Sequence, residues 1–114
     1  MKQYTSKDQT AKLIELGFPK PQGWGNKDIS NGMSISLYND GRESFNYSIG
    51  ELIEFLCPHL DTTIYRLELQ KINECAWDVE ARDVNHNSLD YQIKSELIDA
   101  LFCACVTLKE EGMI

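Results

Sequence analysis

Few residues of this 114-residue chain have the type and spacing that catalysis or metal binding requires. The pair that comes closest to such a motif is Cys57 and His59. A thiolate and an imidazole two residues apart could bind one metal ion, but a zinc site needs four ligands, or three and a water molecule. The only other histidine, His86, lies far along the sequence. We therefore expect no metal site, and interpret Cys57 as a thiol at a helix end beside a solvated histidine.

Other kinds of catalytic site find equally little support. Glu51 and Glu54 lie three residues apart along one predicted helix, whereas paired catalytic carboxylates face each other across a cleft. A Cys–His pair built on Cys75 or Cys103 would need a lowered thiol pKa and an orienting third group, which no local sequence indicates. The segment 23–25, Gly-Trp-Gly, precedes no helix and is no phosphate-binding loop. We predict no catalytic residue and no cofactor.

The net charge of −7 is unevenly distributed. Residues 1–27 hold five lysines against two acidic residues, a net +3, so the remainder carries −10. An acidic body disfavours binding to phosphates, because each neutralised phosphate needs a cation. We therefore expect no nucleic-acid partner. One alternative is an acidic inhibitor, a surface that imitates a nucleic-acid backbone and blocks a DNA-binding host protein.

The chain shows no membrane or export signal. No apolar run reaches the roughly 18 residues that would span a bilayer, and the N-terminal residues lack the apolar core of a signal peptide. We therefore expect a cytoplasmic protein with no membrane partner. Thiols stay reduced in that compartment, so the cysteines are predicted to be free: Cys57, Cys75, Cys103 and Cys105.

Three amphipathic helices are predicted, and they must position any functional surface of the protein. The clearest begins at Ser48, which forms a capping box with Glu51 because each side chain can take a backbone donor of the first turn. Ser6 and Gln9 have the same capping-box spacing at the first helix, and Gly17 supplies the left-handed residue that ends it. Ser95 is expected to cap the last helix, and Gly112 lies just beyond its end. The last helix has the broadest apolar stripe and should anchor the core. The predicted ranges are 6–16, 48–57 and 95–111.

Alternation of apolar and polar residues predicts five strands, each with one covered face. The inward-facing sets are Met33, Ile35 and Leu37; Phe45 and Tyr47; Tyr65, Leu67 and Leu69; Trp77, Val79 and Ala81; and Leu89, Tyr91 and Ile93. Short polar loops favour antiparallel pairing. The predicted fold class is α+β, in two layers: an antiparallel sheet of about five strands with helices packed on one face, in the order αββαβββα, within a single domain 1–114.

Two features of the chain could form an interaction surface. The segment 18–32 contains prolines and glycines without periodicity, so it is predicted to be a long loop, and Trp24 is its one residue with a large surface to bury or offer. Phe102, Cys103 and Val106 lie behind the main stripe of the last helix. We predict that the 18–32 loop or a second copy of the protein covers this patch. The alternative is that the fold simply tolerates it.

Three segments of the chain resemble segments of other short proteins. They are 4–18 (YTSKDQTAKLIELGF), 47–56 (YSIGELIEFL) and the end of the chain, with 96–101 (ELIDAL) and 108–112 (LKEEG). In this order they resemble a group of short uncharacterised proteins from genomes, prophages and mobile elements of gut anaerobic bacteria. The resemblance implies an intracellular bacterial or phage protein, and it implies no activity.

Together these features predict a small non-enzymatic interaction or regulatory protein. It would act on an unknown protein partner, or on a second copy as a homodimer, through the long loop, the solvated sheet face or the back of the last helix. The alternatives are the acidic inhibitor and a small enzyme without a recognisable motif.

Overall fold

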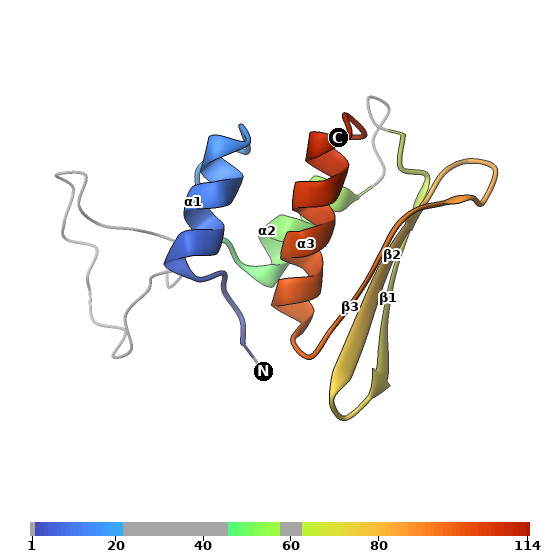
Figure 1. Cartoon of the computed structure of the whole chain (residues 1–114), viewed down its shortest axis with the longest axis horizontal. Helices are drawn as coiled ribbons and strands as arrows, with labels where there is room; N and C mark the ends of the chain where they lie inside the picture. The colour runs from blue at the N-terminus through green and yellow to red at the C-terminus, as the bar shows by residue number, and fades with distance from the viewer. Residues whose placement is uncertain (1, 22–45, 58–62) are drawn as a thin grey trace, which may run out of the picture.

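The computed structural model describes residues 2–21, 46–57 and 63–114. In these residues it has three helices and one antiparallel sheet (Figure 1), which confirms the α+β class. The elements are α1 (Lys7–Glu15), α2 (Ile49–Leu56), β1 (Arg66–Asn73), β2 (Ala76–Arg82), β3 (Ser88–Lys94) and α3 (Leu97–Glu110).

The described sheet has three strands in the order β1-β2-β3, and not five. The first predicted strand, with Met33, Ile35 and Leu37, and Phe45 of the second lie outside the described residues, as do Trp24 and most of the 18–32 loop. Tyr47 was expected to end the second strand, but it belongs to no strand of the described sheet. Its backbone N–H instead donates to the hydroxyl of Thr5 at 3.0 Å.

The helix ends follow the local sequence with one exception. Ser6 with Gln9 and Ser48 with Glu51 both form capping boxes, and Gly17 and Gly112 have φ of 99° and 76° beyond α1 and α3. The expected cap at Ser95 is wrong. The N-cap of α3 is Glu96, and its side chain makes no capping hydrogen bond.

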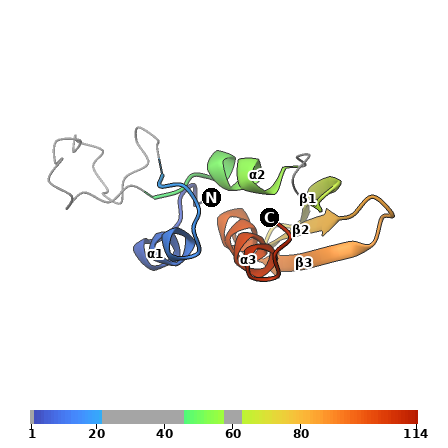
Figure 2. The same cartoon turned by 90° about the horizontal axis from the view of Figure 1, so that it is seen from above.

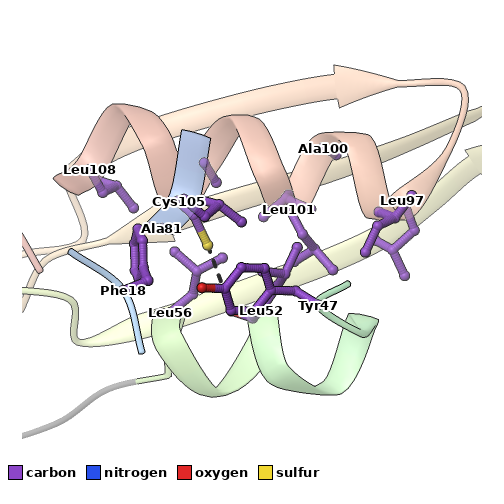
Figure 3. Packing of buried hydrophobic residues seen from close by; sticks show 14 of the residues in the cluster. Phe18, Tyr47, Leu52, Leu56, Ala81, Leu97, Ala100, Leu101, Cys105 and Leu108 are labelled. Carbon is purple, nitrogen blue, oxygen red and sulfur yellow. Dashed lines mark hydrogen bonds between the residues drawn. The ribbon is translucent and has the colours of Figure 1, made fainter. Parts of the chain in front are cut away.

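The helix α3 is the centre of the core. It packs against β2 and β3 on one side and contacts both other helices, so all three helices lie on one side of the sheet (Figure 2). Leu52 and Leu56 of α2 point towards Leu101 and Cys105 of α3 (Figure 3), and all four side chains are fully buried. The prediction that the last helix anchors the core is therefore confirmed.

The sheet register fixes which side chains face α3. Leu67 and Leu69 of β1 lie opposite Ala81 and Val79 of β2, which are buried, so β1 and β2 present the predicted residues to the core. Trp77 also packs against the core cluster. This part of the two-layer prediction is confirmed.

The prediction for β3 is confirmed for Leu89, which packs against the core, and wrong for Tyr91 and Ile93. Asp90 and Gln92 pair with the buried Ala81 and Val79, so Tyr91 and Ile93 face away from α3, and each is 49% exposed. The register between β2 and β3 shifts at Arg82, which pairs with Ser88, and Leu89 becomes the additional residue of a bulge. Because side chains alternate strictly along a strand, the pairing register decides which set is covered.

Tyr65 also departs from the prediction, since it precedes β1 and is exposed. Its backbone N–H donates to the carbonyl of Arg82 at 2.8 Å, and its ring lies edge-on to His86. The side chain thus covers the loop between β2 and β3 instead of the core.

Candidate interaction surface

The sheet face turned away from α3 has no covering element in the part of the chain that the structure describes (Figure 2). We call it the outer face. It exists because polar residues alternate with the core residues along β1 and β2, and because the β3 register adds two large side chains. Its residues are Arg66, Glu68, Gln70, Asp78, Glu80, Arg82, Tyr91 and Ile93.

The charges of the outer face form cross-strand rows. Arg66 lies opposite Arg82, and Glu68 lies opposite Glu80. Like charges directly opposite would repel, but the diagonal neighbours in an antiparallel pair are also within reach of long side chains. The face is therefore organised by diagonal contacts between the arginine row and the glutamate row.

Arg82 is the centre of these contacts. Its Nε lies 3.2 Å from Glu68 Oε1, its Nη2 lies 2.8 Å from Glu80 Oε1, and its Nη1 donates to the carbonyl of His86 at 2.8 Å. Arg66 Nη2 also contacts Glu68, at 3.3 Å. The hydrogen bond with Glu68 is the largest cause of the raised pKa of Arg82, and the charge of Glu80 adds to it. Arg82 therefore has a fixed position between two carboxylates and the following loop.

Asp83 orders that loop. Its Oδ1 accepts hydrogen bonds from the backbone N–H groups of Asn85 and Asn87, both at 2.9 Å. These bonds lower the pKa of the Asp83 carboxyl group, the bond from Asn87 most strongly. His86 has a φ of 67°, the left-handed conformation that such a tight loop requires. The loop consequently presents the His86 carbonyl to Arg82.

A hollow of about 440 Å³ lies on the outer face over β1 and β2. The side chains around it are mostly polar, and the hollow is open to solvent. At its β3 side the hydroxyl of Tyr91 donates to Asp78 Oδ2 at 3.4 Å. Burial against the sheet raises the pKa of Tyr91, and the nearby Asp78 carboxylate raises it further. Tyr91 therefore remains a neutral hydrogen-bonding phenol at physiological pH.

This arrangement suits recognition better than catalysis. Glu68 and Glu80 are each in contact with an arginine, so neither is presented as an unengaged general base. Arginine and tyrosine are both enriched at protein interfaces, and Ile93 adds an exposed apolar side chain beside them. The outer face thus offers fixed charges, a phenol and an apolar side chain on one rigid sheet.

The predicted patch on α3 has a different environment. Trp24 lies outside the described residues, whereas Phe102, Cys103 and Val106 are partly buried, and Phe102 and Val106 pack against the core. The structure does not bring this patch to the outer face, because α3 lies on the other side of the sheet. Its covering by the 18–32 loop or by a second copy stays a prediction.

The helix α1 contacts the same side of α3. Gln9 Nε2 donates to Asp99 at 2.9 Å, and Lys12 pairs with Glu110 at 3.7 Å. Asp99 lies about one turn before Phe102, and Glu110 lies about one turn after Val106 along the helix. The helix α1 therefore lies against α3 at both ends of the predicted patch, a contact that the sequence did not indicate.

All four cysteines are free, as predicted. Cys105 is fully buried and its thiol contacts the carbonyl of Leu52 at 3.9 Å, and burial raises its pKa. Burial also raises the pKa of Cys103. Neither has the lowered pKa of a catalytic thiol. Cys57 is described but His59 is not, and among the described residues no three His, Cys, Asp or Glu side chains gather as metal ligands would.

None of the helices in the described ranges has the length and apolar character needed to cross a membrane. No protein-family model, curated protein or solved structure matches the chain.

Proposed function

We propose that the protein is a small non-enzymatic interaction or regulatory protein that binds a protein partner on the outer face of its sheet. The sequence resemblance supports a role in a bacterium or its mobile elements. The observation that carries the proposal is the outer face itself, where Tyr91 and Ile93 are each 49% exposed beside an ordered arginine–carboxylate network.

The network provides specificity. Arg82 is held by three contacts, so its charge and those of Glu68 and Glu80 have fixed positions before any partner binds. Preorganised charges lose little side-chain freedom on binding and exclude partners with a mismatched pattern. Tyr91 and Ile93 would supply the apolar contact that the network lacks.

The charge of the outer face indicates the partner's chemistry. Three carboxylates, Glu68, Asp78 and Glu80, outnumber the two arginines, and the protein as a whole carries −7. We therefore expect a partner surface with basic residues around an apolar centre. The outer face carries a row of arginines beside its carboxylates, unlike the uniformly negative charge of a nucleic-acid backbone, so it supports a protein-specific surface better than an acidic inhibitor.

A charge-matched pair of double variants tests the proposal. Gln70→Lys with Asp78→Lys changes the charge by +3 at the hollow. Glu74→Lys with Asn85→Lys makes the same change in two exposed turns, at residues that are not part of the outer face or of the hollow's lining. Each tagged variant is used for affinity capture from native extract of the source organism, with quantitative mass spectrometry. We expect the first variant to lose the partner that the wild type captures.

The Glu74/Asn85 variant should retain the partner, since its net charge equals that of the first variant. Thermal unfolding must show that both variants fold. Equal capture by the two variants and the wild type would show that the outer face is not the binding surface.

A further inference from the structure

Among the described residues, one edge of the strand β3 has no neighbouring strand. The strand pairs with β2 on one side, and no described residue pairs with it on the other. An edge strand exposes backbone N–H and C=O groups that can pair with a further strand, and proteins usually block such edges with charges, proline or a covering element. The strand contains no proline, and Tyr91 and Ile93 are exposed on it. The edge is therefore suited to a partner strand.

We propose that the partner strand is β3 of a second copy, paired antiparallel about a two-fold axis at Gln92. In this register Asp90 lies opposite the partner's Lys94, and Tyr91 lies opposite the partner's Ile93. The opposite charges and the aromatic–β-branched pair are both favourable cross-strand combinations. Because the symmetry repeats every contact, the interface contains two of each.

Only this register pairs the charges of β3. An axis at Tyr91 would place Asp90 opposite the partner's Gln92 and Ser88 opposite the partner's Lys94. An axis at Ile93 would place Lys94 opposite the partner's Gln92. Neither register gives an ion pair, so charge complementarity selects the axis at Gln92.

The surroundings of Asp90 support this register. Gln92 Nε2 donates to both carboxylate oxygens of Asp90, at 3.0 and 3.1 Å. Partial burial raises the pKa of Asp90, and the negative charge of Glu111 raises it further. The carboxylate thus has an amide donor and an acidic neighbour, and in the described part of the chain it has no ion-pair partner. A lysine from a second copy would supply the cation.

Lys94 is equally suited to this contact. It is exposed, and in the described residues it forms no ion pair, although its charge partly offsets the effect of burial, which raises the pKa of the Cys103 thiol. Trp77 lies opposite it on β2 and offers no charge. Its ammonium group can therefore turn to a neighbouring strand without breaking an existing pair.

The other edge of the sheet is a poorer candidate. On β1 the charges of Arg66 and Glu68 are already engaged with each other and with Arg82. Pairing through β3 joins two sheets into one and keeps both α3 helices on the same side. A contact along one seven-residue strand is small, so the dimer should be weak and depend on concentration.

Two charge variants test the register together. Lys94→Asp places two like negative charges opposite each other in the homodimer, and Asp90→Lys places two like positive charges there. Each variant should dimerise at least about tenfold more weakly than the wild type in sedimentation-velocity experiments. An equimolar mixture should form a heterodimer, because each chain then supplies the charge that the other lacks.

Cysteine cross-linking gives a second measurement on exposed positions of the strand. In a Cys75→Ser background, Tyr91→Cys mixed with Ile93→Cys should give a disulfide-linked heterodimer under mild oxidation, at least about fivefold more than either variant alone. The two positions lie opposite each other only in the proposed register.

Three results would overturn the proposal. They are a wild type that remains monomeric up to millimolar concentration, a dimer that persists in both charge variants, and charge variants that fail to associate when mixed although circular dichroism shows them folded. The inference does not depend on the proposed function. Gln70 and Asp78 lie on β1 and β2, so the Gln70→Lys/Asp78→Lys variant should still dimerise through β3 even where it loses the partner.

Discussion

A buried polar network ties the first helix to the middle of the chain, and its removal makes the sharpest stability prediction. The backbone N–H of Tyr47 donates to Thr5 Oγ1 at 3.0 Å, the hydroxyls of Thr5 and Thr10 lie 2.7 Å apart, and Thr10 donates to Asn46 Oδ1 at 2.6 Å. Since the hydroxyl of Thr10 donates its only proton to Asn46, Thr5 must be the donor in the bond between the two hydroxyls.

Thr10→Val keeps the shape of the side chain but removes both hydrogen bonds of its hydroxyl. It leaves the Thr5 proton and Asn46 Oδ1 without these partners at positions that are 2% and 1% exposed. A buried unsatisfied polar group costs about 1–3 kcal/mol, so the two together should lower the free energy of unfolding by about 2–6 kcal/mol. This is a large part of the stability of a single domain, which is about 5–15 kcal/mol.

Urea denaturation followed by far-ultraviolet circular dichroism measures this loss. Thr10→Ser is the matched control, since it keeps the hydroxyl and should lose only about 1 kcal/mol for the missing methyl group. If Thr10→Val is as stable as Thr10→Ser, the network does not hold the first helix in the way that its geometry indicates.

Four further outcomes are expected. Ser48→Ala should lower the free energy of unfolding by about 1 kcal/mol, because the capping box of α2 is lost, and urea denaturation measures it. Leu101→Ala should cost about 2–5 kcal/mol in the same assay, since it leaves a cavity at the fully buried centre of α3. Iodoacetamide at mildly alkaline pH should label the exposed Cys75 in the folded protein and leave the buried Cys105 unlabelled until urea is added, as peptide mass spectrometry can show. Burial raises the pKa of Tyr47 from 10.0 to about 12, so the contribution of the neutral Tyr47 phenol to stability is complete below pH 10 and is lost as the pH rises towards 12. Tyr47→Phe should remove this part of the loss of stability at alkaline pH, as urea denaturation curves between pH 9 and about pH 12 can measure.

Features that depend on residues three or four apart were predictable. The capping boxes at Ser6 and Ser48 and the left-handed glycines at 17 and 112 are local patterns, and the structure has all four. The cap at Ser95 failed because Ser95 lies one position too early, and α3 begins without a side-chain cap. The core positions Leu52 and Leu101 were also predictable, since an amphipathic helix has only one apolar face to bury.

The surface was harder to predict than the core. Tyr91 and Ile93 were assigned to the core because they are apolar and alternate with polar residues, yet the bulge at Leu89 places them on the outer face. Asp90 and Gln92 alternate with them, and in the structure it is these polar residues that are partly buried. No local pattern decides which of the two sets is covered.

The amino-acid sequence by itself determined the helices, the capping boxes of α1 and α2 and the residues of β1 and β2 that meet α3, because these follow from backbone hydrogen bonding and from periodicities within one element. Only the tertiary structure decided the face of β3, the position of Arg82 between two glutamates, and the joining of Thr5, Thr10 and Asn46. Each of these depends on strand register or on contacts between distant segments, and a single residue of register shift reverses which side chains reach solvent.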